Sequence, residues 1–209
     1  MSKKNPIRIL IADDHAIVRM GLRALFEPES DLTVVGEADD GESAISACRK
    51  CIPDIVIMDI MMPGLNGIDA TRGIRASLPD VKILILTTSG VSDDIAAALA
   101  AGADGALLKS TANTQLVRAV RQLAAGQPVI AEDIQRLLAD DPPTPDLTTR
   151  PLQILADLTR GLTNANISRH LSLQEDSVKE HVNAIYRKLG ASNRAEAAAI
   201  AMRKHLLKI

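Results

Sequence analysis

The sequence predicts two domains, an α/β doubly wound parallel five-stranded sheet in residues 1–125 and a small all-α domain in residues 147–209. Three observations support this division. Short aliphatic runs alternate with helix-like segments in the first region, a proline-rich acidic stretch follows it, and the last region shows only helical periodicity. Alternating strands and helices are typical of a parallel sheet that is covered by helices on both faces.

Each expected strand in the first region is a short run of Ile, Leu, Val or Ala. These runs lie near residues 7–12, 33–37, 54–58, 81–86 and 104–108. Buried parallel strands are apolar throughout, because helices cover both of their faces. Between the runs, apolar residues recur at helical spacing, so each strand begins a βα unit with a right-handed crossover.

The segment 126–146 is predicted to be a linker that contains one short helix, at 131–139. Residues 140–146 hold three prolines and three acidic residues among seven positions. Proline lacks a backbone N–H and restricts the residue before it, so this stretch favours a stiffened, solvated connection over regular structure.

The last region, 147–209, is predicted to be helical throughout. Thr163 is a candidate N-cap for a helix that ends near Leu171. A second helix at about 175–188 carries an apolar stripe that includes Val178 and Val182, with polar residues outside the stripe. A short helix, a tight turn and a helix with a polar outer face are typical of a helix-turn-helix, whose second helix enters the major groove of DNA.

Charge is distributed unevenly along the chain although the formal net charge is only −2. From Asp146 onward there are ten Lys and Arg against six Asp and Glu, a balance of +4, which leaves −6 for the preceding residues. A basic second half suggests that only this half meets a polyanion. No apolar stretch approaches the length of a membrane span and the N-terminus lacks a signal-peptide pattern, so we expect a cytoplasmic protein.

Polar residues follow four of the predicted strands. Asp13 and Asp14 follow the first, Asp59 the third, Thr87 the fourth and Lys109 the fifth. Because ligands of open α/β sheets lie beyond the carboxyl ends of the strands, these side chains are expected to share one crevice. Each acid alone is more often a helix N-cap. The ordered set instead favours a site that binds a divalent metal and takes up a phosphoryl group.

The cysteine and histidine residues show no comparable arrangement. Cys48 and Cys51 form a C-x-x-C near the end of a predicted helix, with no second ligand pair, so we interpret them as structural or incidental thiols. The four histidines lack metal-ligand spacing in the sequence, and His15 is interpreted as structural or solvent-facing. The histidines are His15, His170, His181 and His205.

Together the two halves resemble a NarL/FixJ-type two-component response regulator, in which a receiver domain precedes a LuxR-type helix-turn-helix. The receiver motifs are Asp13-Asp14-His15, Asp59 with Met62-Pro63-Gly64 and Gly67, Thr87, and Lys109. The C-terminal motifs are Leu162-Thr163-Asn164, Val178-Lys179-Glu180-His181-Val182, Lys188-Leu189-Gly190 and Arg194-Ala195-Glu196-Ala197. The resemblance covers nearly the whole chain and implies a flavodoxin-like receiver fold.

The resemblance also implies roles for individual residues. Mg²⁺ would be held by Asp13, Asp14, Asp59 and the backbone carbonyl of Met61. Asp59 would accept a phosphoryl group from a sensor histidine kinase, assisted by Lys109 and Thr87. The protein would then act as a transcription regulator rather than an enzyme, as a homodimer on promoter DNA. The expected DNA contacts are Lys179 and Asn183 to bases, and Arg187 and Lys188 to the backbone.

Several residues depart from the family pattern. Ala106 stands where an aromatic residue is common on the fifth strand, and Ala165 and Asn183 stand where many relatives carry Lys. Glu180 places an acid on the expected DNA-facing side. An alternative function is therefore a phospho-signalling adaptor whose C-terminal domain binds protein rather than DNA. A free-standing metal-dependent phosphatase is disfavoured, because no second domain is predicted to cover the crevice.

Overall fold

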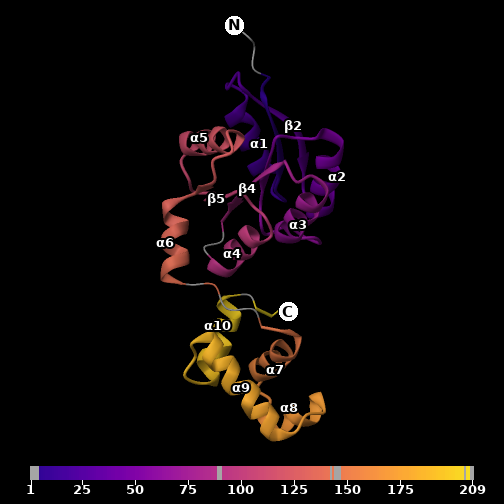
Figure 1. Ribbon diagram of the computed structural model, residues 1–209, viewed down its shortest axis with the longest axis vertical. Helices are drawn as coiled ribbons and strands as arrows, with labels where there is room; N and C mark the ends of the chain where they lie inside the picture. Colours follow the sequence, from indigo (N-terminus) through magenta and orange to yellow (C-terminus); the bar gives the residue numbers. More distant parts are fainter. Residues whose placement is uncertain (1–4, 89–90, 142, 144–146, 205, 208–209) are drawn as a thin grey trace. The chain divides into compact units, whose positions relative to one another are not determined.

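The structure is a computed structural model that describes residues 5–88, 91–141, 143, 147–204 and 206–207 (Figure 1). It contains two compact units, Met1–Pro142 and Pro143–Ile209, so the division falls inside the proline-rich segment. Each unit has its own hydrophobic core. No helix among the described residues is long and apolar enough to cross a bilayer.

The first unit is built on one parallel sheet with strand order β2-β1-β3-β4-β5-β6. The strands are β1 (Ile7–Ala12), β2 (Leu32–Ala38), β3 (Ile55–Met58), β4 (Lys82–Thr87), β5 (Gly105–Leu108) and β6 (Val129–Ile130). The five predicted strands and the doubly wound class are confirmed. The sheet has one strand more than predicted, because the two residues of β6 are too few to produce a sequence pattern.

Helices cover both faces of this sheet. On one face α1 (Ala16–Phe26) and α5 (Asn113–Ala124) pack on side chains such as Ile9 and Ile11. On the other face α2 (Gly41–Cys51), α3 (Gly67–Ser77) and α4 (Ser92–Ala100) pack on side chains such as Leu10 and Ala12. Alternate residues of β1 from Ile9 to Ala12 thus enter two different cores, which explains why these four positions are all apolar.

The predicted linker helix is present as α6 (Glu132–Asp140), and it packs on the first unit. Ile134 is fully buried in the core on the α4 side of the sheet, and Leu137 and Leu138 pack against the same core. The hydroxyl of Ser92 at the start of α4 also donates to Asp141 Oδ2 over 2.9 Å. The segment assigned to a linker from 126 onward therefore lies against the sheet as far as Asp141, because α6 has an apolar stripe.

The second unit contains the predicted helices. They are α7 (Thr149–Thr159), α8 (Asn164–Leu171), α9 (Glu175–Leu189) and α10 (Arg194–Arg203). Thr163 is the N-cap of α8, since its side chain accepts from Asn166 N over 3.3 Å. Asn193 caps α10, since its side chain accepts from Glu196 N over 2.9 Å. Val178, Val182 and Ile185 of α9 are buried in the core of this unit.

Candidate functional site

The acidic residues of the first unit lie where the direction of strand winding changes. β1 has β2 on one side and β3 on the other, and ligands of such sheets bind at this position. Asp13 follows the end of β1 and Asp59 follows the end of β3, and the preceding residues Ala12 and Met58 are partners in the sheet register. The amide of Asp59 also donates to Ala12 O over 2.8 Å. Backbone pairing thus fixes the two carboxylates side by side.

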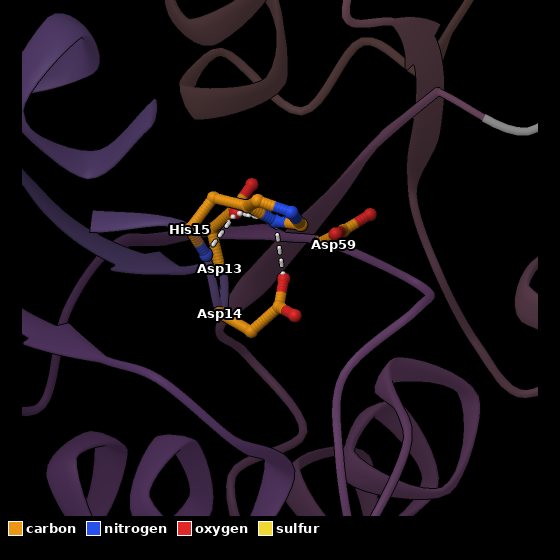
Figure 2. A group of neighbouring side chains, drawn as sticks. All are labelled: Asp13, Asp14, His15 and Asp59. Atoms are coloured by element: carbon orange, nitrogen blue, oxygen red, sulfur yellow. Dashed lines mark hydrogen bonds and ion pairs between the residues drawn. The ribbon is translucent and has the colours of Figure 1, made fainter. Parts of the chain in front are cut away.

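Three carboxylates and one ammonium meet in this crevice. Potential ligand atoms of Asp13, Asp14, His15 and Asp59 all lie within 4.8 Å of one another (Figure 2). The side chains of Asp13 and Asp59 are each only 3% exposed. Lys109 Nζ lies 2.5 Å from Asp13 Oδ2 and 2.8 Å from Asp59 Oδ2. The structure therefore brings together the acids and the lysine that were predicted from separate strand ends.

Burial and charge act on the titration of this cluster in opposite directions. Burial raises the pKa of Asp59, and this effect outweighs the opposing hydrogen bond from Lys109. For Lys109 burial acts to lower the pKa, but the hydrogen bonds to Asp13 and Asp59 outweigh it and raise the pKa. One ammonium therefore compensates several carboxylates only in part, and the crevice favours a further cation.

The donor atoms fit a divalent metal ion. Within the described part of the chain, Asp59 Oδ1 is buried and has no hydrogen-bond partner. A buried carboxylate oxygen without a partner is costly unless something else pairs with it. Carboxylate oxygens are the ligands that hard cations such as Mg²⁺ prefer. Asp13, Asp14 and Asp59 are therefore suited to hold such an ion, and Met61, two residues after Asp59, is half exposed.

A close backbone approach shapes the loop after Asp59. A Cβ atom at Gly67 would lie 1.9 Å from the carbonyl oxygen of Asp59, so only glycine fits at this position. The amide of Gly67 donates to Ile60 O over 2.9 Å, and α3 starts at this residue. Gly64 adopts a positive φ of 67°, a backbone conformation that glycine adopts readily in a turn. The loop is thereby packed against the phosphoacceptor candidate.

Thr87 lies at the end of β4 and is fully buried. Its carbonyl accepts from the amide of Lys109 over 2.8 Å, which joins the ends of β4 and β5 beside the crevice. Ala106, at the position where an aromatic residue is common, is fully buried in the same core as Ile134 of α6. The core around the small Ala106 side chain thus includes a residue from α6.

His15 was interpreted from the sequence as structural or solvent-facing, and its side chain is 64% exposed. Its Nδ1 nevertheless lies 2.6 Å from Asp14 Oδ1 and 3.4 Å from Asp13 Oδ1. Its position directly after the acidic pair was the one signal in the sequence that could have placed it in the site. The predicted structural role of Cys48 agrees with its burial, which raises the pKa of the thiol to about 12.

In the second unit, α9 turns its predicted DNA-contacting residues to the surface. Lys179, Asn183, Arg187 and Lys188 are all exposed, whereas the apolar stripe is buried. Lys179 Nζ lies 3.1 Å from Asp176 Oδ1, and the hydrogen bond to this acid raises the pKa of Lys179. The helix therefore offers a polar face, with one lysine engaged by acids of its own first turn.

Comparison with known proteins agrees with this division into units. Residues 9–121 match the response regulator receiver domain, and residues 145–201 match the bacterial regulatory proteins of the luxR family. The chain belongs to the LuxR-type response regulators. Members of this family are two-component response regulators that combine a receiver domain with a helix-turn-helix, as the resemblance in the sequence implied.

Two relatives align with nearly the whole chain. The nitrate/nitrite response regulator protein homolog of Haemophilus influenzae is 34% identical over 201 residues, covering 94% of this chain and 97% of the relative. The transcriptional regulatory protein LiaR of Bacillus subtilis is 37% identical over 209 residues, covering 96% and 99%. These relatives align with both units of the chain.

Solved structures of response regulators are also similar. A structure of two RcsB dimers bound to two parallel DNAs has a TM-score of 0.71 at 27% identity, covering 95% of this chain and 99% of that one. The response regulator ChrA of a heme-sensing two-component system has a TM-score of 0.59 at 37% identity, covering 98% and 100%.

Proposed function

We propose that a sensor histidine kinase phosphorylates this response regulator on Asp59 in a Mg²⁺-dependent reaction, and that phosphorylation controls promoter binding and transcription. The observation that carries this proposal is the environment of Asp59. Its Oδ2 contacts Lys109 at 2.8 Å, while its buried Oδ1 has no partner among the described residues. A carboxylate that accepts a phosphoryl group needs both a fixed cation beside it and an oxygen that no hydrogen bond occupies.

In the proposed reaction, an oxygen of Asp59 attacks the phosphorus of a phosphohistidine. An O–P bond forms as the P–N bond breaks, and the histidine nitrogen keeps the bonding electron pair and takes up a proton. Bound Mg²⁺, held by Asp13, Asp14, Asp59 and the Met61 carbonyl, would supply charge neutralisation on the phosphoryl oxygens. Lys109 would contribute a second positive charge on the other side. Thr87 would donate a hydrogen bond to the phosphoryl group after transfer.

The kinase is proposed to approach over α1. This helix begins beside the acidic cluster and exposes Ile17 by 80% and Met20 by 69%. Met61, beside Asp59, is also exposed by 51%. Large exposed apolar side chains grouped beside a reactive group favour contact with another protein. A kinase domain seated here would bring its phosphohistidine to Asp59.

The assignment of Asp59 is tested with a small phosphodonor, acetyl phosphate. Intact mass of the wild-type protein should increase by one phosphoryl group when Mg²⁺ is present, and Asp59→Asn should show no increase. Asp54→Asn is the matched control, because Asp54 precedes the same strand and accepts from the amide of Arg8 at the opposite end of the sheet. Labelling of Asp59→Asn at the wild-type level would refute the proposal.

DNA binding is proposed to involve a dimer of the second unit. α10 exposes Ala195, Ala199 and Met202 along one side, and small residues permit close approach of two helices. The isolated segment 146–209, whose first residue lies outside the described ones, should bind paired half-sites more tightly than one. Binding to a single half-site with no gain from a second would contradict dimerisation.

The adaptor function remains the second candidate, and one observation favours it. Lys179 is engaged by Asp176 and lies 4.0 Å from Glu175, and Glu180 adds a further acid to the same helix. These acids oppose contact with phosphate. A gel-shift assay on randomised DNA at two salt concentrations separates the functions, because DNA binding through Lys and Arg must weaken as salt rises. Absence of binding at low salt would favour the adaptor.

A further inference from the structure

The orientation of His15 indicates a role beyond its position at a helix end. His15 is the N-cap residue of α1, yet its side chain makes no capping hydrogen bond. The imidazole instead turns back toward the acidic residues (Figure 2). Its Nδ1 lies 2.6 Å from Asp14 Oδ1 and 3.4 Å from Asp13 Oδ1. The ring therefore borders the cluster that is proposed to hold the metal.

The oxygens nearest to His15 are not the ones that Lys109 uses. Lys109 contacts Oδ2 of Asp13 and Oδ2 of Asp59. Asp13 presents its Oδ1 to His15, and Asp59 keeps a buried Oδ1 without a partner in the described residues. Each of these acids thus has one oxygen engaged by the lysine and a second oxygen that the lysine does not use. The second oxygen of Asp13 also accepts from the backbone amide of His15 over 2.9 Å.

The spacing of these atoms suits a single six-coordinate ion. Bonds of about 2.1 Å place neighbouring ligand atoms about 3.0 Å apart and opposite ones about 4.2 Å apart. His15 Nδ1 lies 2.6 Å from Asp14 Oδ1 and 3.4 Å from Asp13 Oδ1, and these two distances bracket the spacing of neighbouring ligand atoms. All four candidate ligand atoms fall within 4.8 Å of one another.

We propose that His15 Nδ1 is a fourth protein ligand of this site, which thereby also takes a divalent first-row transition ion. Imidazole nitrogen favours ions such as Co²⁺ and Zn²⁺, whereas carboxylates and water suit Mg²⁺. A site with three carboxylates and one imidazole should therefore bind Co²⁺ more tightly than its carboxylates alone would. This inference rests on the proposed function, because it uses Asp13, Asp14 and Asp59 as metal ligands.

If His15 oriented a carboxylate ligand instead of binding the metal, its removal would change the metal affinities in a different way. If His15 only donated a hydrogen bond to Asp14, it would orient one carboxylate ligand, as partners of metal ligands commonly do. Removal of the ring would then weaken binding of every cation by a similar factor. A ligand nitrogen instead changes the relative affinities of Co²⁺ and Mg²⁺. The comparison of two ions therefore distinguishes coordination from orientation.

The experiment is calorimetric titration of the full chain with Co²⁺ and, separately, with Mg²⁺ at about pH 8, where imidazole is neutral. His15→Asn should bind Co²⁺ at least about tenfold more weakly, while its affinity for Mg²⁺ stays within about twofold. His170→Asn is the matched control, because His170 Nδ1 lies 2.7 Å from Asp157 Oδ2 in the other unit. This control should leave both affinities unchanged.

Proton NMR of the Co²⁺-loaded protein supplies a second readout. Ring protons of a coordinated His15 should be paramagnetically shifted in the wild type and in His170→Asn, and these signals should be absent from His15→Asn. Equal weakening of both ions, unchanged Co²⁺ binding, or absence of Co²⁺ binding by the wild type would each overturn the role of His15. Asp59→Asn reports separately on the proposed function, because retention of wild-type Mg²⁺ affinity in that variant would contradict the metal assignment itself.

Discussion

The crevice of the first unit and the outer face of α9 present their polar side chains in different ways. In the crevice, Asp13, Asp59 and Lys109 are largely buried, and Lys109 contacts both acids from the end of β5. On α9, Lys179 and Arg187 are exposed, and Lys179 contacts acids of its own helix. Folding alone assembles the proposed phosphoacceptor site, whereas the proposed DNA-binding face of α9 would meet its partner groups only in a complex with DNA.

The largest effect is expected in the buried crevice, on the rate of phosphorylation. Lys109→Ala should slow phosphorylation by acetyl phosphate about 100-fold or more, because it removes a fixed positive charge from a buried site. Lys82→Ala is the matched control, since Lys82 pairs with Asp104 near the opposite end of β4 and is far from the reaction. Time courses of intact mass measure both rates. Equal rates in the two variants would show that the contact with Asp59 has no part in the reaction.

A smaller effect is expected on the exposed face. Lys179→Ala should cost about 1–3 kcal/mol on a preferred DNA sequence and relax the preference at one base position. Lys188→Ala should weaken all sequences alike and reduce the salt dependence, because phosphate contacts carry no sequence information. Competition assays with preferred and random DNA measure the difference. If Lys179→Ala lowered both affinities equally, Lys179 would be a phosphate contact rather than a base contact.

The smallest effect concerns the stability of the first unit. Burial raises the pKa of Asp59 in the folded protein above its unfolded value. Ionisation of this carboxyl therefore opposes folding. The protonated carboxyl contributes its full stability at low pH, and that contribution is lost as pH rises through the folded-state pKa. Asp59→Asn should therefore raise Tm by a few degrees at neutral pH without metal. The gain should shrink as pH falls toward the ordinary Asp value of about 3.9. Thermal melts that show a lower Tm for the variant at neutral pH would contradict this account.

The sequence predicts the position of a residue well where that residue directly follows a recognisable strand, because the backbone then fixes where its side chain lies. The strand ends were predictable because aliphatic runs mark buried parallel strands, and the crevice residues follow them directly. The packing of α6 was obscured by the prolines that follow it, although Ile134 and Leu138 lie at helical spacing. The contact of Lys179 with Asp176 depends on rotamers of exposed side chains, which no sequence pattern specifies.

The direction of the His15 side chain, in the first unit, likewise could not be predicted from the sequence. Its place after the acidic pair was visible in the sequence, but the direction of its ring depends on the first turn of α1. An N-cap histidine can face solvent, the helix or the preceding residues. Only the structure shows that this ring turns toward Asp14.

The central claim is that phosphorylation of Asp59 controls DNA binding by the second unit. The most direct measurement is the affinity of the full chain for paired-site DNA, selected from the host genome, with and without acetyl phosphate and Mg²⁺. Wild-type affinity should rise at least about tenfold, or about 1.4 kcal/mol, on phosphorylation, while Asp59→Asn should not respond. Equal affinity of the phosphorylated and unphosphorylated wild-type protein, with phosphorylation verified by mass, would contradict the account.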